Sequence, residues 1–460
     1  MMNDNASVVG KLILRGKLLL KTPLLIGSGD KSDYVDIVTL KDPDGIPYIP
    51  ATSLTGVLRH YFTENVASPE AKEDYRLFWG CSLSNTDSVQ SALFIRDLTT
   101  QDEPKIIVRD GVRINSLGIV DEGMKYDFEV IEPGIGFDLY LEVTLRKHFD
   151  KIVFKNIFAY LVQVLRSGGL AVGAMTTKGL GSIELAKGYD CREFDFTRKL
   201  DVIAWLASDF TVGQQLEVPK EWVFPPNNQD LTAEIDLAIV NSLIIRQYVP
   251  TGDADAIHLG SNGQPIISGT SLKGALKNRA KRIVGTLGGE INLLDGLFGP
   301  LKREEEEAKQ KRIRSRVLVN EPIIYNATAK DQTRVKVDRF TGGAIDGALF
   351  TTRPLWSSNG KNKMTTIKVT IKNYQDWEVG LLLLLVKDLW TSDLPVGGEK
   401  SIGRGTFTGI KAKIMLGGKL IEISEQDGNL ILSGASPEDL QKYVDALVAK
   451  CGEGAVICSQ

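Results

Sequence analysis

The pattern of apolar and polar positions along this chain occurs twice. Residues 11–25 alternate loosely between apolar and polar side chains, which predicts a half-buried strand, and residues 231–245 repeat that pattern. A polar loop rich in glycine and aspartate follows each strand, at 27–36 in the first half and at 251–255 in the second. The two halves are therefore predicted to begin with the same strand and loop.

The halves match more closely after these loops. Residues 45–56 read GIPYIPATSLTG, and residues 263–274 read GQPIISGTSLKG. Each segment runs into an amphipathic pattern that predicts a helix, over 57–66 in the first half and over 275–284 in the second.

Further matches follow in the same order along both halves. They are LFWG at 77–80 with LFG at 297–299, predicted strands at 92–97 and 316–321, VRIN at 112–115 with VKVD at 335–338, a strand and a buried helix at 139–145 and 155–167 with 366–371 and 377–390, and glycine-rich loops at 172–181 and 396–405. One shared word would be a weak signal, but a series of matches in one order predicts a tandem duplication.

The order of strands and helices in each half is that of a β-α-β-β-α-β unit. The chain is therefore predicted to be an α+β protein with two tandem ferredoxin-like (RRM-like) domains, each carrying a long loop or hairpin insertion. The predicted domains are 1–216 and 231–411, joined by a linker rich in proline and asparagine at 217–230 and followed by an appendage of a hairpin and a helix at 412–460. A charge-dense insertion at 302–316 predicts an exposed helix.

Composition narrows the class of protein. The net charge of −3 and the pI near 5.9 count against a free-standing, strongly basic nucleic-acid binder, although a local basic groove can sit on an acidic protein. Residues 1–7 show no signal pattern, and the longest apolar run, at 379–386, is far shorter than a membrane span, so a cytoplasmic protein without membrane contact is expected. The four cysteines form no C-x-x-C pair, and His60, His148 and His258 lie in no motif, so each histidine is expected at the surface or satisfied in a core.

Candidate RNA contacts lie where each loop enters its helix. A helix start offers free backbone N–H groups and the positive end of the helix dipole, which suit an RNA phosphate. The candidates are Ser53 and Arg59 in the first half, and Ser271 with the basic row Lys273, Lys277 and Lys281 in the second. The second helix is the more basic, so the stronger phosphate contact is predicted there. The alternative is an ordinary capped helix with a solvated face.

The glycine-rich loops add Lys178 in the first half, and Lys400 and Arg404 in the second. Glycine lets the backbone approach a ligand closely, so these side chains are further candidates for RNA contacts. The alternative is a tight connection without a ligand. The second loop lacks the Lys-Ser/Thr ending of a nucleotide-binding P-loop, so nucleotide hydrolysis is not predicted.

Aspartates precede the proline-containing turn of each half. They are Asp33 and Asp36 in the first half, and Asp253 and Asp255 in the second. A carboxylate there could activate a 2′-hydroxyl of RNA for cleavage or hold a divalent cation. The alternative is that these aspartates are plain turn residues.

The motifs P-x-I-x-[GA]-T-S-L-[KT]-G, L-F-[WG], and the late K-G-L-G and G-R-G loops resemble those of the repeat-associated mystery protein (RAMP) superfamily. The resemblance covers almost the whole chain, apart from the tail and the insertion. Within the superfamily the two halves are similar to the seven-class backbone subunits of type III CRISPR effector complexes. The tandem fusion resembles the variant type III-D systems, whose backbone subunits are joined into longer chains.

This resemblance implies a specific function. Such subunits form a filament along a CRISPR RNA (crRNA), and a hairpin thumb flips a nucleotide out of the duplex between guide and target. An early-loop aspartate then helps to cut the target RNA with Mg²⁺ or Mn²⁺. Asp36 and Asp255 fit that aspartate and its transient metal ligand, and Asp253 is a near rival of Asp255.

The resemblance also places the thumbs and names the partners. The thumb would start near Arg113 in the first half and near Lys336 and Arg339 in the second. The implied partners are crRNA, target RNA and other type III Cas subunits, including a large polymerase-like subunit.

Three functions remain open from the sequence. The first is a backbone subunit that cleaves RNA, and the second is a scaffold that binds crRNA without cutting. The third, a crRNA-processing endonuclease of the same superfamily, is disfavoured because such enzymes usually rely on a histidine base and no histidine here lies in a comparable motif.

Overall fold

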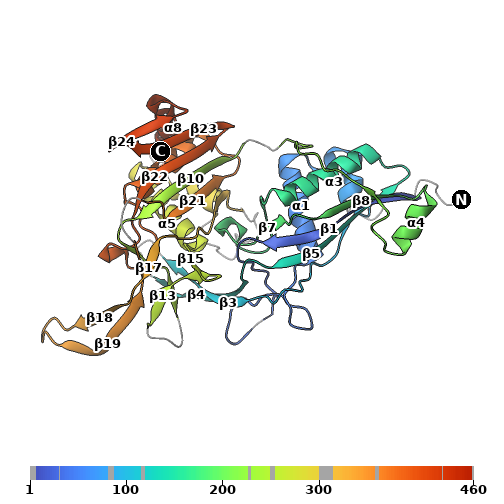
Figure 1. The fold of residues 1–460 in the computed structure, drawn as a ribbon. Helices are drawn as coiled ribbons and strands as arrows, with labels where there is room; N and C mark the ends of the chain where they lie inside the picture. The colour runs from blue at the N-terminus through green and yellow to red at the C-terminus, as the bar shows by residue number, and fades with distance from the viewer. Residues whose placement is uncertain are drawn as a thin grey trace. The chain divides into compact units, whose positions relative to one another are not determined.

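A computed structural model gives the structure of the chain in two compact units. It describes residues 7–30, 32–80, 88–114, 120–225, 229–248, 254–299, 314–357, 362–426 and 428–457. Unit 1 consists of Met1–Val108, Asp127–Thr176 and Leu180–Asn227, and unit 2 consists of Arg109–Tyr126, Thr177–Gly179 and Asn228–Gln460 (Figure 1). Unit 2 thus includes two short segments that belong to the first repeat by sequence.

The sheet of unit 1 has the strand order β2-β5-β1-β7, with β6 beyond β7, β8 also paired with β1, and β9 paired with β8. The central strand β1 runs antiparallel to β5, and its alternating side chains Leu12, Leu14 and Leu18 are buried. Helices α1 and α3 pack their apolar stripes into the same core. The bounds are β1 (Val8–Leu20), β2 (Leu93–Ile95), β5 (Gly136–Arg146), β6 (Leu170–Ala171), β7 (Ser182–Leu185), β8 (Asp190–Asp195), β9 (Gln214–Gln215), α1 (Ala51–Asn65) and α3 (Lys151–Arg166).

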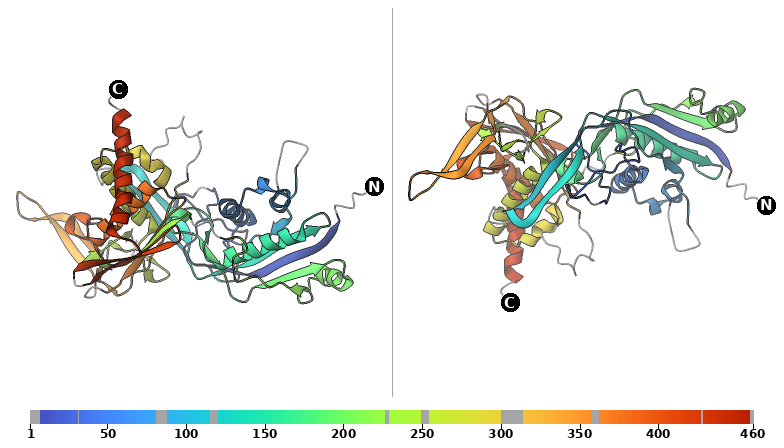
Figure 2. Two further views of the ribbon diagram at one scale, coloured as in Figure 1. Left: turned by 90° about the horizontal axis from the view of Figure 1, so that it is seen from above. Right: turned by 90° about the horizontal axis from the view of Figure 1, so that it is seen from below.

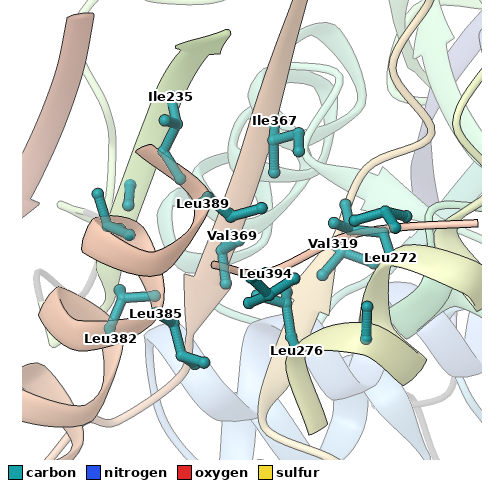
Figure 3. Close-up of a cluster of buried hydrophobic side chains, with 14 of the residues drawn as sticks. Ile235, Leu272, Leu276, Val319, Ile367, Val369, Leu382, Leu385, Leu389 and Leu394 are labelled. Atoms are coloured by element: carbon teal, nitrogen blue, oxygen red, sulfur yellow. The ribbon is translucent and has the colours of Figure 1, made fainter. Parts of the chain in front are cut away.

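The sheet of unit 2 has the order β16-β21-β10-β22-β23-β24. Helices α5 and α7 cover it, and Figure 3 shows Leu272 and Leu276 of α5 and Leu385 of α7 in the core with strand residues. The bounds are β10 (Leu231–Ile239), β16 (Val317–Val319), β21 (Thr365–Ile371), β22 (Phe407–Leu416), β23 (Lys419–Gln426), β24 (Asn429–Ser433), α5 (Gly269–Thr286) and α7 (Asp376–Trp390).

The predicted duplication and the α+β fold class are confirmed by the strand orders. β2-β5-β1-β7 in unit 1 and β16-β21-β10-β22 in unit 2 visit the strands of each repeat in the same order, which is that of a ferredoxin-like sheet. The helices begin earlier than predicted, because the S-L-T-G and S-L-K-G segments form the first turns of α1 and α5 rather than the loops before them.

Each repeat carries a long hairpin. Hairpin 1 consists of β3 (Ile106–Ile114) and β4 (Val120–Ile131), and hairpin 2 consists of β18 (Gln332–Val337) and β19 (Ala344–Arg353). Hairpin 2 projects away from the rest of unit 2 in all the views of Figures 1 and 2.

Short elements complete the described parts. Those of unit 1 are η2 (Pro69–Ala71), α2 (Glu73–Trp79), η3 (Thr176–Lys178) and α4 (Lys199–Leu206). Those of unit 2 are β11 (Ser242–Leu243), β12 (Arg246–Tyr248), β13 (Ala256–His258), β14 (Gly260–Ser261), β15 (Gln264–Pro265), η4 (Ile291–Leu294), α6 (Asp295–Phe298), β17 (Ala327–Ala329), β20 (Leu355–Ser357), η6 (Lys400–Ile402) and α8 (Pro437–Ile457). In the described parts of the chain, no helix combines the length and apolarity that a membrane span requires.

The tail is built into unit 2 rather than appended to it. Strand β22 runs across the predicted boundary at 411/412, and β23 and β24 extend the same sheet. Helix α8 begins with a capping box, in which Ser436 and Asp439 exchange side-chain hydrogen bonds with each other's backbone N–H groups, and its Leu447 and Cys451 are fully buried. Turn and cap signals locate a hairpin and a helix in a sequence, but they do not show that these elements join an existing sheet.

Candidate nucleic-acid interface

Asp36 lies where the early loop of the first repeat meets the returning strand of hairpin 1. Its Oδ2 accepts a hydrogen bond of 2.8 Å from the backbone N–H of Asp127 in β4. The next residue, Ile37, donates its own N–H to the carbonyl of Asp127 at 3.1 Å and forms a parallel bridge with Phe128. The carboxylate therefore ties the early loop to the base of the hairpin.

Asp255 makes the same contacts in the second repeat. Its Oδ2 accepts a hydrogen bond of 2.7 Å from the backbone N–H of Thr351 in β19, and its N–H donates to the carbonyl of Thr351 at 2.9 Å. The next residue, Ala256, pairs in parallel with Thr352. Asp36 and Asp255 are therefore structurally equivalent, as the sequence comparison predicted.

Both carboxylates can still bind a ligand. Each side chain is exposed, and within the described residues no hydrogen bond reaches the second oxygen, Oδ1, of either aspartate. No group of three or more His, Cys, Asp or Glu residues that could hold a metal lies among those residues. A divalent cation would therefore need RNA phosphate oxygens and water to complete its shell around one carboxylate, which is a common way to bind Mg²⁺.

The other aspartate candidates differ in their positions. Asp33 lies in the same loop as Asp36 and is exposed. Asp253 lies outside the described residues, so its predicted role as a rival of Asp255 stays a prediction.

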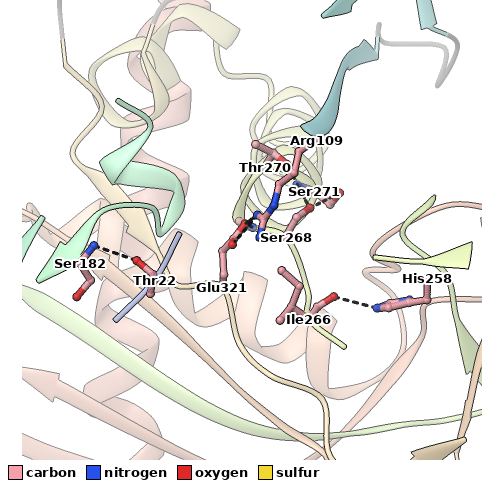
Figure 4. Close-up of polar contacts among 10 residues, drawn as sticks. Thr22, Arg109, Ser182, His258, Ile266, Ser268, Thr270, Ser271 and Glu321 are labelled. Atoms are coloured by element: carbon pink, nitrogen blue, oxygen red, sulfur yellow. Dashed lines mark hydrogen bonds and ion pairs between the residues drawn. The ribbon is translucent and has the colours of Figure 1, made fainter. Parts of the chain in front are cut away.

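His258 is held in the core close to Asp255 and is no candidate base. Its Nδ1 accepts the N–H of Ile245 at 3.2 Å, and its Nε2 lies 2.9 Å from the carbonyl oxygen of Ile266 (Figure 4). These two contacts define the neutral tautomer with the proton on Nε2. Burial lowers the pKa of His258 to about 4, so the ring is neutral at neutral pH.

The lowered pKa of His258 makes stability depend on pH. In the unfolded chain the ring titrates near its ordinary value of 6.5, so between pH 6.5 and 4 the unfolded state binds the extra proton. The contribution of the neutral His258 ring to the free energy of unfolding is fully present above pH 6.5. It is lost as the pH falls to 4, and the loss amounts to roughly 3 kcal/mol. The midpoint temperature of thermal unfolding should therefore fall less steeply for His258→Gln than for the wild type as the pH is lowered across this range. The control is the matched change His60→Gln, because the His60 side chain is exposed beside Glu64 and is not part of a core.

At each helix start predicted to bind phosphate, in the Ser53 and Ser271 segments, the first helical N–H already donates to a protein carboxylate. Glu321 accepts the N–H of Gly269, the first residue of α5, at 3.0 Å, and Asp97 accepts the N–H of Ala51, the first residue of α1, at 2.7 Å. The N-cap Ser268 also accepts the N–H of Ser271 at 3.3 Å. One N–H group at each helix start is therefore taken by a protein carboxylate, and the RNA contacts predicted for Ser53 and Ser271 stay predictions.

Lys273 does not lie on an exposed basic face, so that prediction is wrong. Its side chain is buried, and its Nζ donates to the carbonyl of Val317 at 2.7 Å and to that of Thr177 at 3.4 Å. Burial, together with the charges of Lys178 and Lys277, lowers the pKa of Lys273 to about 7. Lys273 therefore fastens α5 to β16 and to the glycine-rich loop of the first repeat.

Arg404 is also internal, again contrary to prediction. It is 2 % exposed, and its Nε lies 2.8 Å from Glu399, which also pairs with Arg246 and Arg334 at 3.0 Å each. Burial works to raise the pKa of Glu399, but the hydrogen bond from Arg246 and the charges of Arg404 and Arg334 outweigh it and lower that pKa. Arg404 also donates to Gln332 of β18. The glycine-rich loop is thus fixed to hairpin 2 by buried charge.

The remaining RNA candidates occupy mixed environments. Arg59 is half-buried with Glu70 at 3.8 Å, and Lys277 donates to the carbonyl of Gly299 at 2.7 Å. Lys281 and Lys178 are also half-buried, and Lys400 is exposed. Arg113 lies in β3, and its side chain is outside the described residues.

The exposed basic residues of unit 2 that fit RNA lie on hairpin 2. Lys336 and Arg339 are exposed, and Phe340 beside them is 99 % exposed at the tip. Asp338 holds the tip by accepting the N–H groups of Phe340 and Thr341, both at 2.8 Å. An aromatic side chain that protrudes fully from a braced hairpin suits insertion between bases. The sequence prediction missed Phe340, although an aromatic residue two positions after an aspartate in a predicted hairpin was a visible signal.

The glycine-rich loops of the repeats close in the same way. Val172 donates its N–H to the carbonyl of Gly181 at 2.8 Å, and Val396 donates to that of Gly405 at 2.9 Å. Both glycines have positive φ, and an added Cβ would lie 1.9 Å from the carbonyl oxygen of the paired valine. The glycines are therefore required by the loop itself, whatever the loop binds.

Comparison with known proteins agrees with this internal symmetry. The sequence profile described as the RAMP superfamily matches residues 17–184 and 252–408, well over half of the chain. Each matched region contains the early-loop aspartate, the hairpin and the glycine-rich loop of one repeat. Among curated proteins, none matches the chain significantly.

Proposed function

This chain belongs to the RAMP superfamily, and from that premise we propose that it is a crRNA-binding backbone subunit of a type III CRISPR effector complex that cleaves target RNA. Family membership marks it as an RNA-binding Cas subunit, because RAMP proteins act in multi-subunit Cas complexes that bind RNA. The type III assignment and the cleavage are the proposal.

One observation carries the proposed cleavage. Asp36 and Asp255 each tie an early loop to the returning strand of a hairpin and keep one oxygen exposed. A hairpin that unstacks a nucleotide would therefore hold the backbone beside a carboxylate. Two equivalent sites in one chain predict two cuts in the target.

The proposed reaction is an in-line attack within the target RNA. The 2′-hydroxyl of the flipped nucleotide attacks the adjacent phosphorus, and the bond to the 5′-oxygen breaks. A 2′,3′-cyclic phosphate forms, and the departing 5′-oxygen takes a proton from water to become a free 5′-hydroxyl. The exposed oxygen of Asp36 or Asp255 would accept the 2′-hydroxyl proton as a general base. A divalent cation, when bound, would be held by the same aspartate and would neutralise charge on the phosphate.

The second candidate function is a scaffold that binds RNA without cutting it. The hydrogen bond that each aspartate makes to its hairpin also fits a purely structural residue, and this favours the alternative. The purified complex, incubated with a labelled complementary RNA with and without Mg²⁺, separates the two. Two Mg²⁺-dependent products support cleavage, and an intact target at saturating complex supports the scaffold.

RNA affinity should depend on hairpin 2 rather than on the start of α5. The change of Lys336 and Arg339 to alanine removes two exposed charges. It should weaken RNA binding and reduce the slope of log K against log salt by roughly 0.7–0.9 for each lost phosphate contact. Titrations at several salt concentrations measure both quantities.

The control for this test is Lys419→Ala, which removes an exposed charge from the first position of β23 in the same unit. It should leave the salt slope unchanged. Equal slopes for the wild type and the Lys336/Arg339 variant would move the RNA-binding surface away from hairpin 2.

A further inference from the structure

The start of α5 in unit 2 is covered by a buried ion pair. Arg109 donates from Nη1 to both carboxylate oxygens of Glu321, at 3.1 and 2.9 Å, and each side chain is 4 % exposed (Figure 4). Glu321 also accepts the N–H of Gly269. Arg109 comes from the segment of hairpin 1 that belongs to unit 2. An arginine of a hairpin therefore supplies the countercharge to the carboxylate at the start of α5.

Unit 1 has the same acid at the start of its own helix, but no cation pairs with it. Asp97 follows β2 as Glu321 follows β16, and it accepts the N–H of Ala51 at the first position of α1. Its side chain is exposed, and no ion pair to it occurs among the described residues. We define Asp97, Ala51 and Thr52 as the α1 acceptor face.

We propose that the α1 acceptor face binds a β-hairpin that presents an arginine, contributed by a different subunit of the same complex. The internal equivalence carries the proposal: the acid that needs an arginine in unit 2 has a counterpart in unit 1 that lacks one. The inference rests on the multi-subunit assembly in the proposed function but not on RNA cleavage.

A second copy of this chain is a poor occupant, because its free hairpin has the wrong chemistry. The matched motifs place Val335 at the position of Val112, so Gln332, three residues earlier, takes the position of Arg109. Gln332 is neutral, and its Oε1 already accepts hydrogen bonds from Arg334 and Arg404. Covering Asp97 with this amide would bury a carboxylate without a countercharge, which is strongly unfavourable.

The loop that covers the start of α1 must also differ from the loop that covers the start of α5. At Gly269 an added Cβ would lie 1.8 Å from the carbonyl oxygen of Lys178, so the loop segment of unit 2 touches the helix backbone there. The residue in the same place in unit 1 is Ala51, whose Cβ keeps such a loop farther away. Asp97 is also one methylene shorter than Glu321. Because of these differences, the chain's own loop and hairpin segments fit the α1 acceptor face poorly, and a segment of a different subunit is favoured there.

Site-specific crosslinking in the assembled complex tests the proposal. A photoreactive p-benzoylphenylalanine replaces Thr52, which is exposed in the first turn of α1, and Thr63, exposed near the other end of α1, is the control position. The adduct at position 52 should map to an arginine-containing β-hairpin of another subunit, and position 63 should not yield it. An adduct with residues 332–353 of this chain would identify a second copy as the occupant and overturn the proposal.

A charge exchange makes the test specific. Asp97→Arg should remove the crosslinked subunit from complexes weighed by native mass spectrometry, and changing the partner's arginine to aspartate should restore it. Asp102→Arg, another change in unit 1, should leave the composition intact. A complete complex with Asp97→Arg would overturn the proposal, whereas a complete wild-type complex that leaves the target RNA uncut would contradict only the proposed catalysis.

Discussion

Replacing Asp36 by asparagine in the assembled complex should remove one product of target-RNA cleavage and leave the other, and Asp255→Asn should do the converse. Asparagine keeps an oxygen that can accept the N–H of Asp127 or Thr351, so the loop should stay in place. The variant loses only the negative charge that would take up a proton. Loss of such a general base costs about a hundredfold or more in rate.

The measurement is single-turnover cleavage of an end-labelled target, with products resolved at nucleotide resolution. Asp33→Asn is the matched control, because it removes an exposed carboxylate from the same loop without touching the contact to hairpin 1. Both products should persist in this control. If both also persist in the Asp36→Asn/Asp255→Asn double variant, the chain is a scaffold and other residues cut.

The duplicated fold could be predicted from the sequence because its signals are local and occur twice. The glycines at 181 and 405 are required by positive φ and a close carbonyl, and such requirements leave the same residue in both repeats. The position of Asp36 and Asp255 was predictable for the same reason, since each precedes a segment that pairs with the returning strand of a hairpin. Repetition turned weak motifs into a reliable alignment.

The basic face of α5 was predicted wrongly because a four-residue spacing is not the period of a helix. Each residue advances by about 100°, so Lys273 and Lys281 lie roughly 80° apart around the axis. Lys273 falls on the side facing β16 and finds a carbonyl there, whereas Lys281 is half-buried. Which side of a helix meets a strand depends on packing, and single-sequence periodicity does not show it.

The acid at each helix start was visible in the sequence but was not interpreted. Glu321 and Asp97 occupy matching positions after matching strands, and both accept the first helical N–H. An acid after a strand can cap the helix that precedes this strand in the chain when the two elements pack side by side. That signal would have argued against a phosphate at the same place.

Breaking the ion pair between Arg109 and Glu321 should have the largest effect on stability. Arg109→Met leaves the Glu321 carboxylate buried without a countercharge, and it should lower the free energy of unfolding by roughly 3–5 kcal/mol. Removing both charges in Arg109→Met/Glu321→Met should cost much less than the single change, because no unpaired charge remains buried. Urea denaturation followed by tryptophan fluorescence measures both values.

Arg353→Met provides the control, since its ion pair with Asp331 is exposed on both sides. Its effect on the free energy of unfolding should be far smaller, because water screens the pair and solvates the aspartate left behind. An Arg109→Met variant as stable as the Arg353→Met variant would show that Glu321 does not need its arginine. The same result would remove the physical reason for expecting an arginine at Asp97, because the unit 1 acid is inferred to need a partner only if its buried counterpart does.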